Sequence, residues 1–102
     1  MSQISPQNNG GFAISGELVF DTVPDLVANG RAMFESDGGT VAIDLAQVTR
    51  ADSAGLALLI EWRRVALGRG KAVAFKNVPA QMIDIAKVSG LDTLLELHGR
   101  GP

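Results

Sequence analysis

The residues of this 102-residue chain that are best placed to do chemistry are Asp52 and Ser53. They follow an apolar segment and precede a long apolar stretch, so they stand where a predicted strand turns into a predicted helix. The first turn of a helix leaves backbone N–H groups without partners in the helix. A hydroxyl there can cap the helix, contact a partner or accept a phosphate group. Because Ser is among the residues preferred at an N-cap, position alone favours a structural cap at Ser53.

Three neighbouring residues each have two possible roles. The Asp52 carboxylate can be stabilised by the helix dipole or contact a partner. Gly55 permits a close approach, either of a partner's backbone or of the sheet beneath the helix. Asp44 stands near the carboxyl end of the apolar strand predicted at 40–45, and it can accept a hydrogen bond in a turn or share a site with Asp52. The shared site is plausible in physical terms because ligands gather at the carboxyl ends of strands in open α/β sheets.

The chain offers little material for catalysis. Cysteine is absent, and the one histidine, His98, stands near the end of the sequence. Two aspartates and a serine lack a general base for nucleophilic catalysis. The sequence contains no Walker-type phosphate loop and no cluster with metal-ligand spacing. We therefore expect no catalytic residues, no metal and no cofactor.

Composition and charge indicate one small domain. A length of 102 residues suits a single domain, and 46% apolar residues can form a core without disulfides. A net charge of −2 supplies no basic field for nucleic acid or anionic lipid. No apolar run reaches the roughly 18 residues of a membrane span. The first ten residues are polar and uncharged, unlike a signal peptide. We expect a cytoplasmic protein that binds no nucleic acid and does not insert into a membrane.

Strands and helices alternate along the chain, which predicts an α/β fold with a largely parallel or mixed sheet. We expect a flexible lead-in at 1–10, a single domain over 11–98 and a tail at 99–102. Right-handed crossovers would place the helices mostly on one face of so small a sheet. In chain order, the expected elements are a strand or strand pair at 12–20, a helix from 22 that 37–39 stops, a strand at 40–45, a helix at 53–67, a strand at 72–75, a helix from 77 that Gly90 ends, and a short strand at 94–97.

Local signals refine three of these elements. Gly16 predicts a turn or a bulge in the first strand. Thr22 can cap the first helix, with Asp25 completing a capping box. The run 40–45 is interrupted only by Asp44 and does not alternate between apolar and polar residues. It therefore predicts a strand buried on both faces, or a central strand covered by helices.

The predicted helix at 53–67 carries more apolar surface than one buried stripe can use. At about 100° per residue its apolar side chains fall on two arcs. Either the helix is well buried, or one arc is a docking surface for another protein. Arg63 interrupts the first arc, which favours the second as core, but Trp is enriched at interface hot spots and we expect Trp62 to reach a partner. The first arc contains Leu56, Leu59, Ile60 and Leu67, and the second contains Ala54, Leu58, Trp62 and Val65.

The order of the elements and three short segments resemble the STAS domain family. The segments are 41–45 (VAIDL), 52–56 (DSAGL) and 88–91 (VSGL), and the resemblance runs from about Phe12 to Leu97. The Asp-Ser-x-Gly-Leu motif is quite specific when it follows an apolar strand after a short turn. The resemblance implies a STAS-type fold, with a four- to five-stranded mixed sheet and helices mainly on one face. It also implies a protein that works by binding partners.

Two branches of this family fit the chain. The segments 15–18, 22–24, 56–59, 61–62 and 77–81 resemble the small STAS subunit of Mla-type phospholipid-transport ABC complexes. This resemblance implies a non-enzymatic subunit that docks on the ATPase subunit of the ABC transporter. There it would support assembly and activity in phospholipid transport between the inner and outer membranes. Its partner would hold it at the periphery of the inner membrane.

The alternative branch is that of the anti-sigma factor antagonists. In that branch, the serine matching Ser53 is phosphorylated by a partner kinase that is also the anti-sigma factor. Both branches imply a partner-binding surface at the start of the helix at 53–67. The residues expected on this surface are Asp52, Ser53, Ala54, Gly55, Leu58 and Trp62, with Ser53 as a possible phosphorylation site.

Overall fold

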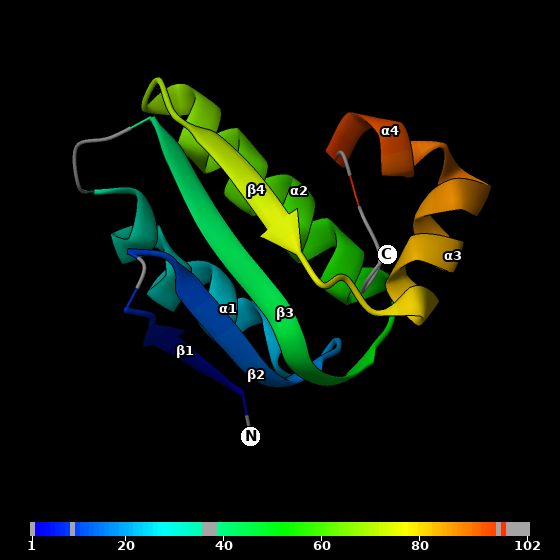
Figure 1. Cartoon of the computed structure of the whole chain (residues 1–102). Helices are drawn as coiled ribbons and strands as arrows, with labels where there is room; N and C mark the ends of the chain where they lie inside the picture. Colours follow the sequence, from blue (N-terminus) through cyan, green and yellow to red (C-terminus); the bar gives the residue numbers. More distant parts are fainter. Residues whose placement is uncertain (1, 9, 36–38, 96, 98–102) are drawn as a thin grey trace.

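The computed structural model describes residues 2–8, 10–35, 39–95 and 97. Its centre is a four-stranded sheet in the order β1-β2-β3-β4 (Figure 1). β1 pairs with β2 antiparallel, whereas β2, β3 and β4 run parallel to one another. The predicted α/β class with a mixed sheet is confirmed. The strands are β1 (Gln3–Pro6), β2 (Phe12–Leu18), β3 (Thr40–Ala51) and β4 (Ala72–Lys76).

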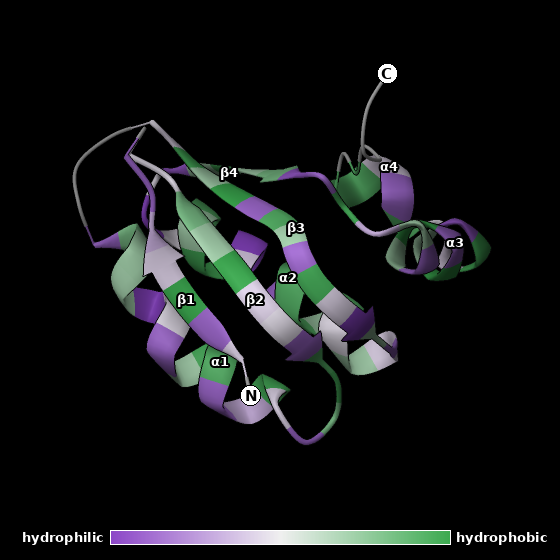
Figure 2. Ribbon diagram, turned by 60° about the horizontal axis from the view of Figure 1, so that its bottom comes forward, coloured by the Kyte–Doolittle hydropathy of each residue, from purple (hydrophilic) through white to green (hydrophobic). Residues whose placement is uncertain are grey.

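The helices α1 and α2 cover one face of the sheet, as Figure 2 shows from a second direction. α2 lies across the middle, with α1 on one side and α3 and α4 on the other, beyond β4 (Figure 1). A short 3-10 helix, η1, continues directly from α1. Helices mainly on one face were predicted, and this is confirmed. The bounds are α1 (Val23–Gly30), η1 (Arg31–Phe34), α2 (Ser53–Gly68), α3 (Ala80–Ser89) and α4 (Leu91–Leu95).

β3 is the central strand, and its burial alternates. Val41, Ile43 and Leu45 are buried, whereas the residues between them are only half-buried. Successive side chains of a strand point to opposite faces, so the helices cover one face of β3 and leave the other partly open. Burial on both faces was therefore the wrong alternative, and a helix-covered central strand is the correct one.

The expected flexible lead-in at 1–10 is wrong for its middle part. Gln3–Pro6 forms β1, which pairs with β2 in a register that runs from Gln3↔Ser15 to Pro6↔Phe12. A turn closes this hairpin, with Gln7 N–H donating to the Gly11 carbonyl at 2.8 Å. The strand lies at the sheet edge, where proline is tolerated and one half-buried apolar residue, Ile4, suffices. Such a strand shows no clear alternation in the sequence, and the ordered domain begins before residue 11.

The expected last strand at 94–97 is also wrong, because Leu91–Leu95 is the helix α4. Gly90 ends α3 in the left-handed conformation, with φ of 73°, so a new helix can start at once in another direction. Leu95 then reaches the core, with 3% of its surface exposed. A short apolar run fits either a strand or a helix, so periodicity could not separate the two. The expected tail at 99–102 lies outside the described residues.

The prediction for Gly16 holds. Gly16 has φ of 92°, and the register between β2 and β3 shifts between Gly16 and Glu17. This is the predicted bulge within one strand.

The first helix is shorter than predicted, since α1 ends at Gly30 and η1 follows it. Of the segment 37–39 that was expected to stop this helix, only Gly39 is among the described residues.

Candidate functional site

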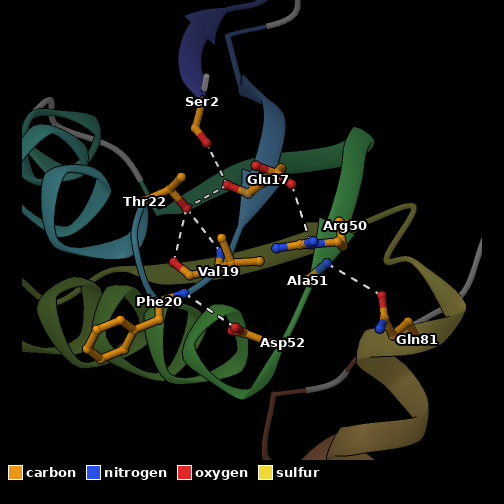
Figure 3. A network of polar contacts seen from close by, with 9 residues as sticks. All are labelled: Ser2, Glu17, Val19, Phe20, Thr22, Arg50, Ala51, Asp52 and Gln81. Carbon is orange, nitrogen blue, oxygen red and sulfur yellow. Dashed lines mark hydrogen bonds and ion pairs between the residues drawn. The ribbon is translucent and has the colours of Figure 1, made fainter.

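The candidate site lies where the carboxyl ends of β2 and β3 meet the start of α2 (Figure 3). Leu18 and Ala51 are paired at the ends of these parallel strands. Just beyond them, the backbone N–H of Asp52 donates to the Leu18 carbonyl at 3.2 Å. The loop after β2 and the Asp-Ser pair after β3 are therefore side by side.

Asp52 is the N-cap of α2, and Ser53 is the first helical residue. The Asp52 carboxylate accepts a hydrogen bond from the Ala54 N–H at 2.8 Å, which satisfies one of the free donors of the first turn. Its other oxygen accepts from the Phe20 N–H at 3.3 Å (Figure 3). The predicted cap at Ser53 is wrong, because the residue before it holds the extended conformation and the carboxylate that a cap requires.

Ser53 is consequently left exposed with its hydroxyl unengaged. No hydrogen bond joins this hydroxyl to another residue in the part of the chain that the structure describes. It stands at the end of the helix where partial positive charge gathers. A partner or a modifying enzyme can reach it without any change of the fold.

Gly55 packs on the sheet, which is one of its two expected roles. A Cβ at this position would lie 2.6 Å from the Leu18 carbonyl oxygen and 3.0 Å from the Leu18 Cβ. Only glycine allows so close an approach between α2 and β2. Gly55 is buried, so it positions the start of α2 and does not face a partner. Ala54, which was also expected on the partner surface, is half-buried.

Leu58 and Trp62 were expected on the partner surface, and this is wrong in the structure. Both have 0% of their surface exposed and belong to the main hydrophobic core. The reason is that α2 has neighbours on three sides: the sheet beneath it, α1 with η1 on one flank, and α3 with α4 on the other. Both apolar arcs are therefore largely used inside the domain, and the well-buried helix is the correct alternative.

Phe20 is a surface residue, although the sequence predicts that it belongs to the strand or strand pair at 12–20. It lies two residues beyond the end of β2, and 79% of its surface is exposed. In Figure 3 its ring points away from the hydrogen-bonded network. Leu18 and Phe20 look like one alternating apolar pair in the sequence, and this pattern hid the turn between them. The following Asp21 was the available signal that the strand had ended.

The loop that carries Phe20 is held by the Thr22 side chain. The Thr22 hydroxyl donates to the Glu17 carbonyl at 2.7 Å and accepts from the Val19 N–H at 3.0 Å (Figure 3). It makes no capping hydrogen bond to α1, although Thr22 occupies the N-cap position. The predicted capping box with Asp25 is therefore wrong, because the hydroxyl closes the loop instead.

Asp44 does not share a site with Asp52. β3 continues beyond Asp44 as far as Ala51, so Asp44 is not at its carboxyl end. The Asp44 carboxylate accepts from the Ala46 N–H at 2.9 Å and from the Asn77 side-chain amide at 3.0 Å. Asn77 has φ of 55°, so Asp44 supports the turn after β4 and its first alternative, a turn acceptor, is correct.

Ion pairs near the site are few and solvent-exposed. Arg50 lies 3.4 Å from the Glu17 carboxylate, next to the loop after β2. Further along α2, Arg64 donates two hydrogen bonds to Glu61, and these bonds lower the pKa of the Glu61 carboxyl below its ordinary value. Neither of these two ion pairs involves Asp52.

Neither a metal centre nor a membrane helix is found in the described parts of the chain. Residues 2–8, 10–35, 39–95 and 97 contain no group of three His, Cys, Asp or Glu side chains that could hold a metal ion. Within the same ranges, no helix has the length and apolar character needed to cross a membrane. His98 lies outside the described residues.

Comparison of the fold with solved structures finds STAS-like proteins. A sulfate transporter family protein from Wolinella succinogenes superposes with a TM-score of 0.65 at 18% identity, over 81% of this chain and 67% of the other. The anti-sigma factor antagonist SpoIIAA in its unphosphorylated form superposes with a TM-score of 0.63 at 16% identity, over 95% of this chain and 100% of the other. At such identities the likeness shows the fold alone.

Curated proteins provide no match to this sequence. A family model described as "Mlab, STAS domain" matches residues 3–96, which is nearly the whole chain. The match includes β1, the helices and the Asp-Ser pair at the start of α2. The chain therefore belongs to the STAS domain family, in the group described as Mlab.

Proposed function

We propose that this protein is a non-enzymatic subunit that docks on the ATPase subunit of an Mla-type ABC transporter. It would support the assembly and activity of that transporter in phospholipid transport between the inner and outer membranes. Its place would be cytoplasmic, at the periphery of the inner membrane through its partner. Membership of the family described as Mlab supports this choice of partner.

The observation that carries the proposal is the exposed, unengaged Ser53 hydroxyl on a rigid frame. Asp52 ties the start of α2 to the loop after β2, through its bonds to Ala54 and Phe20. We call Phe20, Asp52 and Ser53 the docking surface. Its residues reach solvent, yet their backbone is fixed before a partner arrives, which lowers the entropic cost of binding.

The same geometry argues against an enzyme. A serine nucleophile needs a general base within hydrogen-bond reach. The carboxylate next to Ser53 is that of Asp52, and its oxygens accept hydrogen bonds from two backbone N–H groups. Through those bonds the carboxylate caps α2 and links the start of α2 to the loop after β2. We therefore expect the purified chain to hydrolyse neither ATP nor phosphate esters.

The direct test mixes the purified full chain with the purified ATPase subunit of the Mla-type transporter from the same host. We expect a complex that survives size-exclusion chromatography, together with a change in the rate of ATP hydrolysis by the ATPase. Absence of a complex at micromolar concentrations would contradict the proposal. Hydrolysis by the chain alone that Asp52→Ala abolishes would contradict its non-enzymatic part.

A second function, anti-sigma factor antagonist, is favoured by the same serine. The Ser53 hydroxyl is free and exposed, as a kinase requires. A phosphate there would add a charge of about −2, which the helix N-terminus would accept and the neighbouring Asp52 would oppose. Phosphorylation would then weaken docking without unfolding the domain. Incubation with the host's anti-sigma kinases and ATP, followed by mass spectrometry of Ser53, separates this function from the first.

A further inference from the structure

We propose that Phe20 is the anchor of the docking surface, and that the partner receives its ring in an apolar pocket with Lys or Arg side chains at the rim. This inference rests on the proposed function, because the partner meant is the ATPase subunit. It adds a residue and a pocket chemistry that the resemblance to the family did not supply. The argument uses the exposure of Phe20, the rigidity of its loop and the charges around it.

Phe20 is exposed to an extent that folding alone does not explain. Other large apolar side chains reach the surface, but Phe20 alone is aromatic among those of the described residues, and it alone lies beside Asp52. Leaving an aromatic ring in water forfeits the hydrophobic stabilisation that burial would supply. Aromatic residues are enriched at the centres of protein interfaces, where a partner supplies that burial. The large exposed apolar residues are Phe20, Leu67, Val88 and Leu94.

The loop under the ring is fixed rather than loose. The Phe20 N–H is bound by the Asp52 carboxylate at 3.3 Å, and the preceding Val19 is 6% exposed. The Thr22 hydroxyl closes the loop through Glu17 and Val19. An exposed ring on an ordered backbone costs less entropy to bind than one on a mobile tip. This arrangement suits an anchor that enters a preformed pocket.

The negative charges of the loop that carries Phe20 and of Asp52 indicate the charge of the partner surface. Asp21, Asp25 and Asp52 are all exposed, and the segment 18–30 contains no Lys or Arg. Arg50, which lies next to this loop, faces Glu17. A surface of this sign repels phosphate-bearing ligands such as nucleic acid or an anionic lipid bilayer. It attracts a protein surface with basic side chains, which fixes orientation and speeds encounter.

The test compares Phe20→Ala with Val88→Ala for binding to the purified ATPase subunit, measured by calorimetry. Val88 is 91% exposed on α3, so the control also removes an exposed apolar side chain, away from the docking surface. If Phe20 is a hot-spot residue of the interface, Phe20→Ala should raise Kd about 30-fold or more. Val88→Ala should leave Kd within about twofold. Phe20→Leu, which keeps apolar bulk, should retain more affinity than Phe20→Ala. Thermal unfolding of all three variants should match that of the unaltered chain.

The charge argument has its own variant. The double change Asp21→Asn with Asp25→Asn should slow association and flatten its dependence on salt concentration, since rim charges act mainly on the association rate. An unchanged association rate and salt dependence would overturn the basic rim.

The outcomes separate the two proposals. If the unaltered chain binds the ATPase and Phe20→Ala binds equally well, the anchor is overturned and the proposed function stands. If the unaltered chain does not bind the ATPase, the proposed function and this inference fall together.

Discussion

The indole ring of Trp62 lies directly against the backbone of Gly30. A Cβ atom at residue 30 would overlap the indole nitrogen and would lie 2.6 Å from Cε2. The ring thus fills the space that a side chain on α1 would take, and it joins α2 to the junction of α1 and η1. Its Nε1 is buried without a hydrogen-bond partner among the described residues, so shape rather than polar bonding holds the ring.

The burial of Trp62 leads to a prediction on stability. Trp62→Ala should lower the free energy of unfolding by about 3–5 kcal/mol, because it removes the largest fully buried side chain and leaves a cavity. Trp62→Phe should cost much less, since the lost N–H has no partner to leave unsatisfied. Urea unfolding followed by circular dichroism measures both. A Trp62→Ala variant as stable as the unaltered chain would contradict the observed packing.

Asp52 should contribute to stability and to the shape of the docking surface at once. Asp52→Ala removes the N-cap and should cost about 1 kcal/mol, the usual value for losing such a cap. Asp52→Asn keeps an oxygen that can accept from the Ala54 N–H and should cost less. The Phe20 N–H loses its acceptor in Asp52→Ala, so its amide hydrogen exchange should speed up. Equal amide exchange rates at Phe20 in the unaltered chain, Asp52→Ala and Asp52→Asn would show that the Asp52 carboxylate does not hold the loop after β2.

Ser53→Glu should reduce partner binding while leaving the fold intact. Ser53 is exposed, and a carboxylate in the first turn of a helix is favourable to the helix itself. The added charge would enter the interface and lose solvation there. Leu67→Glu is the matched control, since Leu67 is 54% exposed near the other end of α2. A pull-down with the ATPase subunit and a thermal melt decide the matter: binding by Ser53→Glu that equals binding by Leu67→Glu would leave Ser53 without a role in docking.

The sequence predicted those features that depend on local rules. Gly16 and Gly90 marked a bulge and a helix end because their conformations favour glycine whatever surrounds them. The long apolar helix α2 and the central strand β3 were predicted because their patterns are strong. The STAS-type fold followed from the same segments and is confirmed by the family model and by the solved structures that superpose on the chain. The place of the site, at the Asp-Ser pair, stays a prediction.

The features that the sequence did not predict depend on tertiary contacts. The Thr22 hydroxyl could either cap α1 or close the loop before it. The position of the Glu17 carbonyl, which the sequence does not give, decides for the loop. Trp62 looked exposed because nothing in the sequence says that Gly30 leaves room for its ring. Phe20 looked buried because two apolar residues spaced by one are typical of a strand. In each case the deciding neighbour is several residues or a whole element away.

The central claim is that the docking surface, made of Phe20, Asp52 and Ser53, contacts the ATPase subunit. Hydrogen–deuterium exchange of the full chain, with and without the purified ATPase subunit, tests it most directly. We expect protection on binding in peptides that cover 19–22 and 52–57, and no change in peptides that cover 85–89 of α3. Protection confined to α3 and α4, with the peptides around Asp52 unchanged, would contradict the claim.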